Sequence, residues 1–144
     1  MIAVDTNVLV YAHREDSPWH EPAHAGLRRL AESRAGWAIP WPCVHEFLAI
    51  VTHPRIFKTP TPLAVALDAI DALLLAPGLV LLSESDGYWQ ELRRLVAAGR
   101  AAGPLVHDAR IAALCRSHGV SELLSADRDF SRFPELSVRN PLVG

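Results

Sequence analysis

Short apolar runs alternate along the chain with longer segments in which apolar residues recur at helical spacing. The short runs predict buried strands at Ile2–Val4, Trp37–Pro40, Leu79–Leu82, Leu123–Ser125 and Leu136–Val138. Strands that alternate with helices pair in parallel through right-handed crossovers. We therefore expect an α/β fold of three layers, in which helices cover both faces of a central parallel sheet of four to five strands.

The helical segments are bounded by proline, glycine and capping residues. Apolar spacing predicts helices over Val8–His13, Ala23–Ser33, Pro42–Val51, Leu63–Leu75, Ser83–Arg100 and Val106–His118, and a helical turn over Asp129–Phe133. Ser83 or Ser85 is expected to cap the helix that ends near Arg100. The segment His53–Pro62 holds three prolines and is expected to be a loop. Leu63–Leu75 is apolar around most of its circumference, so we expect about half of its apolar side chains to lie in the core.

The composition is that of one ordinary globular domain, which we expect to span residues 1–144. Half of the residues are hydrophobic (50%) and 21% are charged, with no repeat and no low-complexity segment. The two cysteines, Cys43 and Cys115, form no CxxC pair, which excludes a disulfide scaffold and a cysteine-type zinc site. The net charge of −2 argues against a protein that coats nucleic acid by bulk positive charge.

No segment is predicted to span a membrane. The longest strongly apolar stretch, residues 69–82, is interrupted by Asp71 and by Pro77-Gly78. Met1 leads directly into the first predicted strand, without a basic segment or a cleavage site for export. We therefore expect a cytoplasmic protein.

Four acidic residues stand where the predicted fold would bring them together. Asp5 and Asp127 follow predicted strands, and Glu46 and Asp108 lie in the first turns of predicted helices. Ligands of parallel sheets bind beyond the carboxyl ends of the strands, so these carboxylates can converge at one edge. Each acid taken alone could equally cap a helix or lie on a solvated face. The functional interpretation therefore depends on the set.

Four converging carboxylates repel one another unless a cation neutralises them. Mg²⁺ or Mn²⁺ is the natural partner, because hard oxygen ligands suit hard cations. Such an ion can activate water and shield a phosphodiester, as in metal-dependent nucleases.

Four short motifs, in order along the chain, resemble the PIN domain. They are Asp5-Thr6-Asn7-Val8-Leu9-Val10-Tyr11, Pro42-Cys43-Val44-His45-Glu46-Phe47, His107-Asp108-Ala109-Arg110-Ile111-Ala112-Ala113-Leu114 and Ser125-Ala126-Asp127-Arg128-Asp129-Phe130. The resemblance covers essentially the whole chain. Within the PIN family, the motifs resemble the VapC-type toxins of bacterial toxin–antitoxin pairs. This resemblance implies an endoribonuclease that uses Mg²⁺, or Mn²⁺, to cut single-stranded or loop RNA.

The resemblance also assigns roles to individual residues. Asp5, Glu46, Asp108 and Asp127 match the catalytic quartet of the family. By analogy, Asp5 and Asp108 bind the metal with the help of Asp127, and Glu46 binds through water or positions the attacking water. Asn7 and Ser125 match polar positions that orient the carboxylates, whereas Asp129 has no assigned role.

The resemblance further implies partners. VapC-like proteins form homodimers and are neutralised by a VapB-like antitoxin, and a partner of one of these kinds would cover part of the apolar Leu63–Leu75 surface. A PIN-like module that binds RNA or protein without catalysis is the alternative. Arginine suits phosphate recognition, so candidates for RNA contact are Arg14, Arg55, Arg110 and Arg128.

Other motifs compete with this interpretation. His20-Glu21-Pro22-Ala23-His24 matches the HExxH zinc pattern, but Pro22 suits only the first helical turn, so we expect His20 to precede the helix and to pack or cap there. Asp5-Thr6-Asn7 lacks the second acid of haloacid-dehalogenase-type phosphatases. The sole lysine, Lys58, stands too early for a receiver domain. Cys43 and His45 do not face each other on a helix, so we expect a buried, structural Cys43.

The assigned carboxylates change how the net charge is interpreted. With the quartet set aside, the rest of the chain changes from net negative to net positive. Much of the negative charge therefore belongs to the predicted metal pocket, and near-neutrality is compatible with an RNA substrate.

Overall fold

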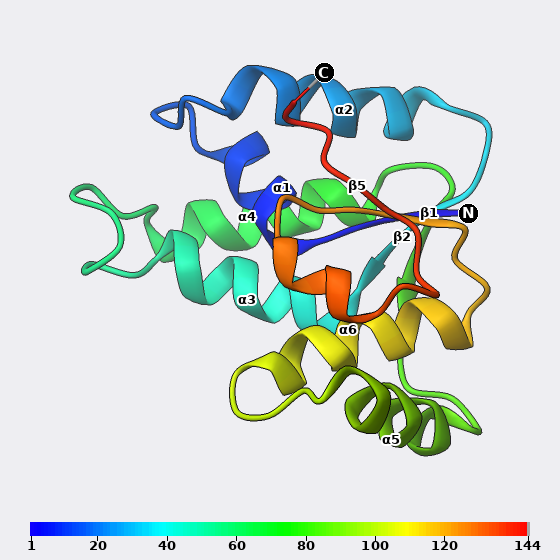
Figure 1. The fold of residues 1–144 in the computed structure, drawn as a ribbon. Coiled ribbons are helices and arrows are strands. Elements are labelled where there is room, and N and C mark those ends of the chain that lie inside the picture. Colours follow the sequence, from blue (N-terminus) through cyan, green and yellow to red (C-terminus); the bar gives the residue numbers. More distant parts are fainter. Residues whose placement is uncertain (144) are drawn as a thin grey trace.

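A five-stranded parallel sheet forms the centre of the computed structural model, which describes residues 1–143 (Figure 1). Its strands are β1 (Ile2–Val4), β2 (Trp37–Pro40), β3 (Leu79–Leu82), β4 (Glu122–Leu124) and β5 (Val138–Arg139), in the spatial order β3-β2-β1-β4-β5. The register aligns Ala3 of β1 with Ala38 of β2 on one side and with Leu123 of β4 on the other. The predicted fold class, a central parallel sheet between helices, is confirmed.

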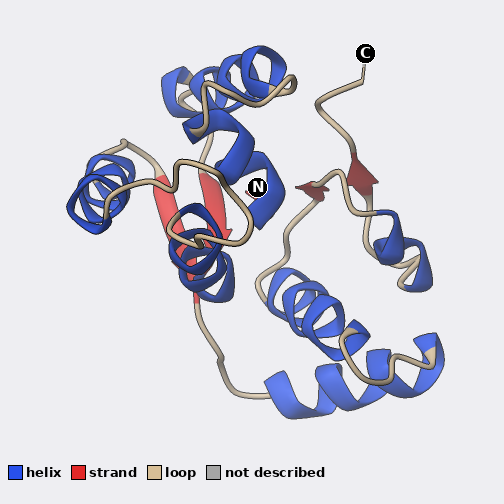
Figure 2. Ribbon diagram, turned by 90° about the vertical axis from the view of Figure 1, so that its left-hand side faces the viewer, coloured by secondary structure: helices blue, strands red, loops and turns tan. Residues whose placement is uncertain are grey.

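Helices follow the strands and cover the sheet. They are α1 (Thr6–His13), α2 (His20–Glu32), α3 (Trp41–Val51), α4 (Leu63–Leu74), α5 (Tyr88–Gly99), α6 (Leu105–Ser117) and the 3₁₀ helix η1 (Arg128–Arg132). The chain moves outward from β1 to β2 and β3, and then returns past β1 to β4 and β5. Because crossovers are right-handed, this reversal places α1–α4 on one face and α5, α6 and η1 on the other. Figures 1 and 2 show the two groups of helices apart from each other.

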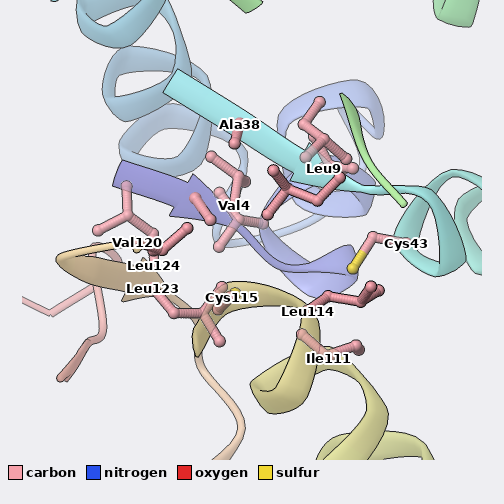
Figure 3. Close-up of a cluster of buried hydrophobic side chains, with 14 of the residues drawn as sticks. Val4, Leu9, Ala38, Cys43, Ile111, Leu114, Cys115, Val120, Leu123 and Leu124 are labelled. Carbon is pink, nitrogen blue, oxygen red and sulfur yellow. The ribbon is translucent and has the colours of Figure 1, made fainter. Parts of the chain in front are cut away.

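The main core lies between the sheet and its helices. Val4 and Leu123 of the sheet, Leu9 of α1 and Leu114 of α6 are almost fully buried (Figure 3). The two cysteines, Cys43 and Cys115, are free thiols that are buried in the same region (Figure 3). This packing holds the short strands in place, although none of them exceeds four residues.

Several element bounds differ from those predicted by the apolar pattern. Helix α1 begins at Thr6 rather than Val8, because the Asp5 side chain caps it by accepting from the Thr6 N–H at 2.8 Å. Helix α5 begins at Tyr88, and neither Ser83 nor Ser85 caps it. The residue before α5, Gly87, has φ +84°, a left-handed conformation that separates the preceding loop from the helix.

Helix α2 also begins earlier than predicted, so the placement of His20 before the helix was wrong. His20 is the first residue of α2, and Pro22 is the third. The first backbone N–H groups of a helix have no partner within it, and a proline there loses no hydrogen bond. A His20 ring nitrogen lies 3.0 Å from the Tyr11 carbonyl oxygen, so this side chain packs against the end of α1.

Helix α4 lies on the surface, with only part of its circumference buried. Ala66 and Ile70 are buried, whereas Leu63 is 64% exposed and Leu67 is 46% exposed. An apolar groove of about 540 Å³ runs beside it, with lining residues from α1, α2 and α4. Within residues 1–143, no helix has the length and apolar character needed to cross a membrane.

Candidate active site

The strand order reverses between β1 and β4, and the polar residues of interest gather at the carboxyl ends of these two strands. Asp5 directly follows β1, and its backbone N–H donates to the Leu124 carbonyl of β4 at 3.0 Å. Ser125 and Asp127 follow β4. A crevice opens at such a reversal because the two connections leave in opposite directions, and ligands of open parallel sheets bind there.

The Asp5 carboxylate is 4% exposed and accepts a hydrogen bond at each of its four lone-pair positions. Oδ1 accepts from the Thr6 N–H at 2.8 Å and from the Cys43 thiol at 3.6 Å. Oδ2 accepts from the Ser125 hydroxyl at 2.6 Å and from the Asn7 amide at 3.2 Å. Burial raises the pKa of Asp5 even against these donors. The carboxylate is thus held in one orientation.

Asn7 and Ser125 join this carboxylate to the loop after β4. The Asn7 Oδ1 atom accepts from the Ala126 N–H at 3.1 Å, which fixes the orientation of the amide. The Ser125 hydroxyl accepts from the Asp127 N–H at 3.0 Å while it donates to Asp5. Both side chains therefore touch Asp5 and order the residues that carry Asp127.

Three carboxylates lie together near the carboxyl ends of β1 and β4. Asp108, in the first turn of α6, contributes an oxygen that lies within 4.8 Å of one oxygen from Asp127 and one from Asp129. Asp129 reaches this group because Asp127 caps η1, where its Oδ1 atom accepts from the Asp129 N–H at 2.8 Å. Asp127 and Asp129, two positions apart in sequence, therefore both contribute to this group.

The electrostatics of this group favour a bound cation. Burial, together with the neighbouring charges of Asp127, Asp5 and Asp129, raises the pKa of Asp108 to about 7. A divalent ion would replace this repulsion by attraction, and an all-oxygen donor set of partly exposed carboxylates suits Mg²⁺ or Mn²⁺. The residues present therefore fit the metal that the resemblance implies.

The predicted quartet thus lies at one end of the sheet, but its members do not form one tight cluster. Asp108 and Asp127 are together, whereas Asp5 and Glu46 lie outside the group of carboxylates within 4.8 Å. The charge of Asp5 raises the pKa of Asp108, and the charge of Glu46 raises that of Asp5. One Glu46 carboxylate oxygen, Oε2, accepts from the Thr6 hydroxyl at 3.0 Å.

Three contacts in the site are not indicated by the acidic pattern alone. They involve the Asp129 carboxylate, the Thr6 hydroxyl and the Cys43 thiol. The Asp129 carboxylate could have been found from the Asp-x-Asp spacing of Asp127 and Asp129, because this pair follows a predicted strand and opens a predicted helical turn. Cys43 is buried as expected, and burial raises the pKa of its thiol well above the usual value, which leaves it a donor rather than a nucleophile.

The HExxH histidines lie apart from this site. The rings of His20 and His24 are 5.4 Å apart on α2. Neither ring belongs to a group of three metal-binding side chains in the described part of the chain. Together with the bond between His20 and Tyr11, this placement indicates a packing role.

The candidate arginines for RNA contact differ in their surroundings. The Arg14 guanidinium is engaged by Asp16 at 2.6 Å and lies 4.0 Å from the centre of the Phe57 ring, so it stabilises a loop of the protein itself. Arg128 is exposed next to Asp127 and lines a groove of about 760 Å³ that includes Ser125 and Asn140. Arg128 is therefore best placed for a phosphate that approaches the carboxylates.

Comparisons with known sequences identify one family. The PIN domain matches residues 2–136. The chain is 39% identical over 144 residues to ribonuclease VapC43 of Mycobacterium tuberculosis (strain H37Rv). The aligned region covers 100% of this chain and 97% of that protein. It is 33% identical over 140 residues to ribonuclease VapC48 of the same strain, covering 97% of each.

Solved structures share the fold. VapBC2 from Rickettsia felis, bound to a DNA fragment from its promoter, matches with a TM-score of 0.68 and 23% identity, over 97% of this chain and 98% of that chain. The sarcin–ricin loop cleaving toxin VapC20 of Mycobacterium tuberculosis matches with a TM-score of 0.67 and 20% identity, over 97% of this chain and 100% of that chain.

Proposed function

Because this chain belongs to the PIN-domain family, and within it to the VapC ribonucleases, we propose that it is a metal-dependent endoribonuclease that cuts single-stranded or loop RNA. The observation that carries the proposal is the group of Asp108, Asp127 and Asp129 at the crevice between β1 and β4, with the pKa of Asp108 raised to about 7. Full-length similarity to curated VapC ribonucleases supports the same activity. We take residues 1–144 as one catalytic domain.

We propose that Asp5, Asp108 and Asp127 hold the ion, and that Asp129 offers a further carboxylate to it. Mg²⁺ is the expected ion, with Mn²⁺ as a substitute, since both prefer oxygen ligands. When bound, such an ion lowers the pKa of water and neutralises charge on a phosphodiester. Asp5 is available for this role only if one of its donors gives way; the Asn7 amide, at 3.2 Å, makes the longer of the two Oδ2 hydrogen bonds.

The remaining polar side chains of the site either exchange protons or hold the carboxylates in orientation. Glu46 is partly exposed beside the crevice, where its carboxylate can accept a proton from an attacking water. Asp108, with a pKa of about 7 in the absence of metal, can hold a proton near neutral pH and release it when a cation arrives. The hydrogen bonds of Ser125 and Asn7 fix the position of the Asp5 carboxylate relative to the loop that carries Asp127.

RNA is the proposed substrate, because Asp127 lines an open groove of about 760 Å³ beside the partly exposed carboxylates, which a flexible strand can enter. Single-stranded and loop RNA can bring a phosphodiester to surface carboxylates, whereas a regular helix holds its backbone rigidly. We place Arg128 on the phosphates beside the cut, from its exposed position on the 760 Å³ groove. We place the enzyme in the cytoplasm, where such RNA is met.

Two protein partners are proposed. A VapB-like antitoxin would cover the apolar groove lined by residues of α1, α2 and α4. It would also cover Leu63 and Leu67, two exposed apolar side chains of α4. A second copy of the chain would form a homodimer, for which the exposed Trp89 of α5 and Val106 of α6, which line a shared apolar hollow, are candidate contacts. Sedimentation velocity of the purified chain would measure the oligomeric state.

The experiment that tests the activity is cleavage of a fluorescent RNA stem-loop by the antitoxin-free protein, first with EDTA and then with added Mg²⁺ or Mn²⁺. We expect cleavage only with metal, and none by the Asp5→Asn variant, which should remain folded. The exposed residue Asp68 of α4 supplies the control variant Asp68→Asn, which should cut at the wild-type rate. Equal cleavage by Asp5→Asn and the wild type would show that the site is wrongly assigned.

A catalytically silent module that only binds RNA or protein is the second candidate. It would retain the stem-loop in a binding assay and release no product at any Mg²⁺ concentration. The full set of carboxylates argues against it, since a binder has no use for four buried or half-buried negative charges.

A further inference from the structure

Thr6 connects two of the carboxylates at the site. Its backbone N–H donates to Asp5 at 2.8 Å, and its hydroxyl donates to Glu46 Oε2 at 3.0 Å, across to α3. We propose that Thr6 is a positioning residue, whose hydroxyl holds the Glu46 carboxylate in the orientation that the reaction requires. This inference depends on the proposed nuclease function, because it assigns a role within the same site.

Glu46 depends on this one hydroxyl. Among residues 1–143, its carboxylate has no other hydrogen-bond donor and no ion-pair partner. A glutamate side chain has several rotatable bonds and is only partly buried here. Without the hydroxyl it would sample several rotamers, and a general base would then spend most of its time misplaced.

The hydroxyl also interacts with the buried Cys43 thiol, but no backbone carbonyl of the helix takes its hydrogen bond. A threonine within a helix commonly donates to the carbonyl four residues earlier, but Thr6 is the first residue of α1, and the preceding residues lie in β1. The side chain is 4% exposed, so its hydroxyl needs an acceptor within the protein. Glu46 supplies that acceptor, and the pair joins the start of α1 to α3.

The two bonds made by residue 6 can be separated by substitution. Thr6→Val keeps the shape of the side chain and the backbone bond to Asp5, and removes only the hydroxyl. Thr6→Ser restores a hydroxyl on the same carbon. Thr61→Val is the matched control, because Thr61 is also buried (8% exposed) and its hydroxyl bonds to His13 at 3.1 Å, away from the carboxylates.

We expect Thr6→Val to lower kcat by about 10- to 100-fold, the loss typical of one hydrogen bond to a charged group. KM for the RNA stem-loop should stay within about twofold, since Thr6 does not touch substrate. Thr6→Ser and Thr61→Val should each keep kcat within about threefold of the wild type. Equal losses in Thr6→Ser and Thr6→Val would overturn the proposal.

A double-mutant cycle with Glu46→Gln tests whether Thr6 acts through Glu46. If it does, adding Thr6→Val to Glu46→Gln should lower kcat by less than about twofold. Losses that multiply would mean that Thr6 acts independently, and the proposal would be wrong.

Crystal structures of the three Thr6 forms give a readout that does not depend on cleavage. We expect the Glu46 carboxylate within hydrogen-bond distance of residue 6 in the wild type and in Thr6→Ser, and displaced in Thr6→Val. An unmoved Glu46 in Thr6→Val would refute the positioning role. If the wild type cuts no RNA, the proposed function fails, and these structures still decide the role of Thr6.

Discussion

Asp108 makes the stability of the metal-free protein depend on pH in a direction opposite to that of a salt-bridged aspartate. Burial and the neighbouring carboxylates raise its pKa from 3.8 to about 7 in the folded chain. Between these values the folded state binds a proton that the unfolded state has released. The free energy of unfolding therefore falls as the pH rises from about 4 to about 7, and this contribution is constant above that range.

The size of the effect follows from the shift and from the surroundings of the side chain. A shift of about three pKa units corresponds to an upper limit of about 4 kcal/mol. Asp108 is only half-buried, so solvent screening reduces the contribution, and we expect about 1–2 kcal/mol. Asp108→Asn removes the charge and should stabilise the metal-free protein above about pH 7 by this amount relative to the wild type.

Urea denaturation in EDTA, at about pH 5 and about pH 8, measures this difference. From about pH 5 to about pH 8, the free energy of unfolding of Asp108→Asn should rise relative to that of the wild type by about 1–2 kcal/mol. The free energy of unfolding of Asp68→Asn should change with pH as that of the wild type does. Added Mg²⁺ should stabilise the wild type more at about pH 8 than at about pH 5, since the ion binds the charged form. Parallel pH curves for Asp108→Asn and the wild type would refute the reasoning.

Three further substitutions test separate parts of the structure. Asp127→Asn should lower kcat for RNA cleavage by at least about 100-fold with a near-native melting curve, and an active variant would remove Asp127 from the site. Arg128→Ala should raise KM and reduce the salt slope of RNA binding by about one, measured by fluorescence anisotropy; an unchanged slope would place the phosphate elsewhere. Gly99→Ala should destabilise by about 1–3 kcal/mol in urea denaturation, because a Cβ there would lie 2.8 Å from Phe133 Cε1 and 3.0 Å from the Arg132 carbonyl oxygen; wild-type stability would show that this turn can relax.

The apolar pattern predicts the sheet better than it predicts the helix starts. Strands β2 and β3 have the expected bounds, because each is a short apolar run between turn residues. Helices α1 and α5 start elsewhere than expected, since one is set by the Asp5 cap and the other by the left-handed Gly87. Caps and positive φ angles depend on backbone geometry, which an apolar pattern does not contain.

The site could be predicted as a set of residues but not as a network. Positions after strands identify Asp5 and Asp127, since topology alone brings them to one edge. The bond from Thr6 to Glu46 links residues 40 positions apart, and nothing in the local sequence of either residue indicates it. The arrival of Asp129 beside Asp108 depends likewise on a 3₁₀ turn that follows the strand. The ligand roles of Asp5, Asp108 and Asp127 remain predictions for the experiments above.

The hydrogen bond between Ser125 and Asp5 joins residues 120 positions apart, and β1 pairs with β4 along its whole length. A growing chain therefore contains β1 and its neighbour β2 long before β4, the neighbour on the other side, has been synthesised. Loop closure over such a distance is slow, so this pairing belongs to the late steps of folding. Until residues 122–127 have joined β1, the carboxylates stay scattered on a chain without a crevice. The topology thus delays the assembly of the carboxylate site until residues 122–127 have left the ribosome, and every shorter nascent chain lacks it.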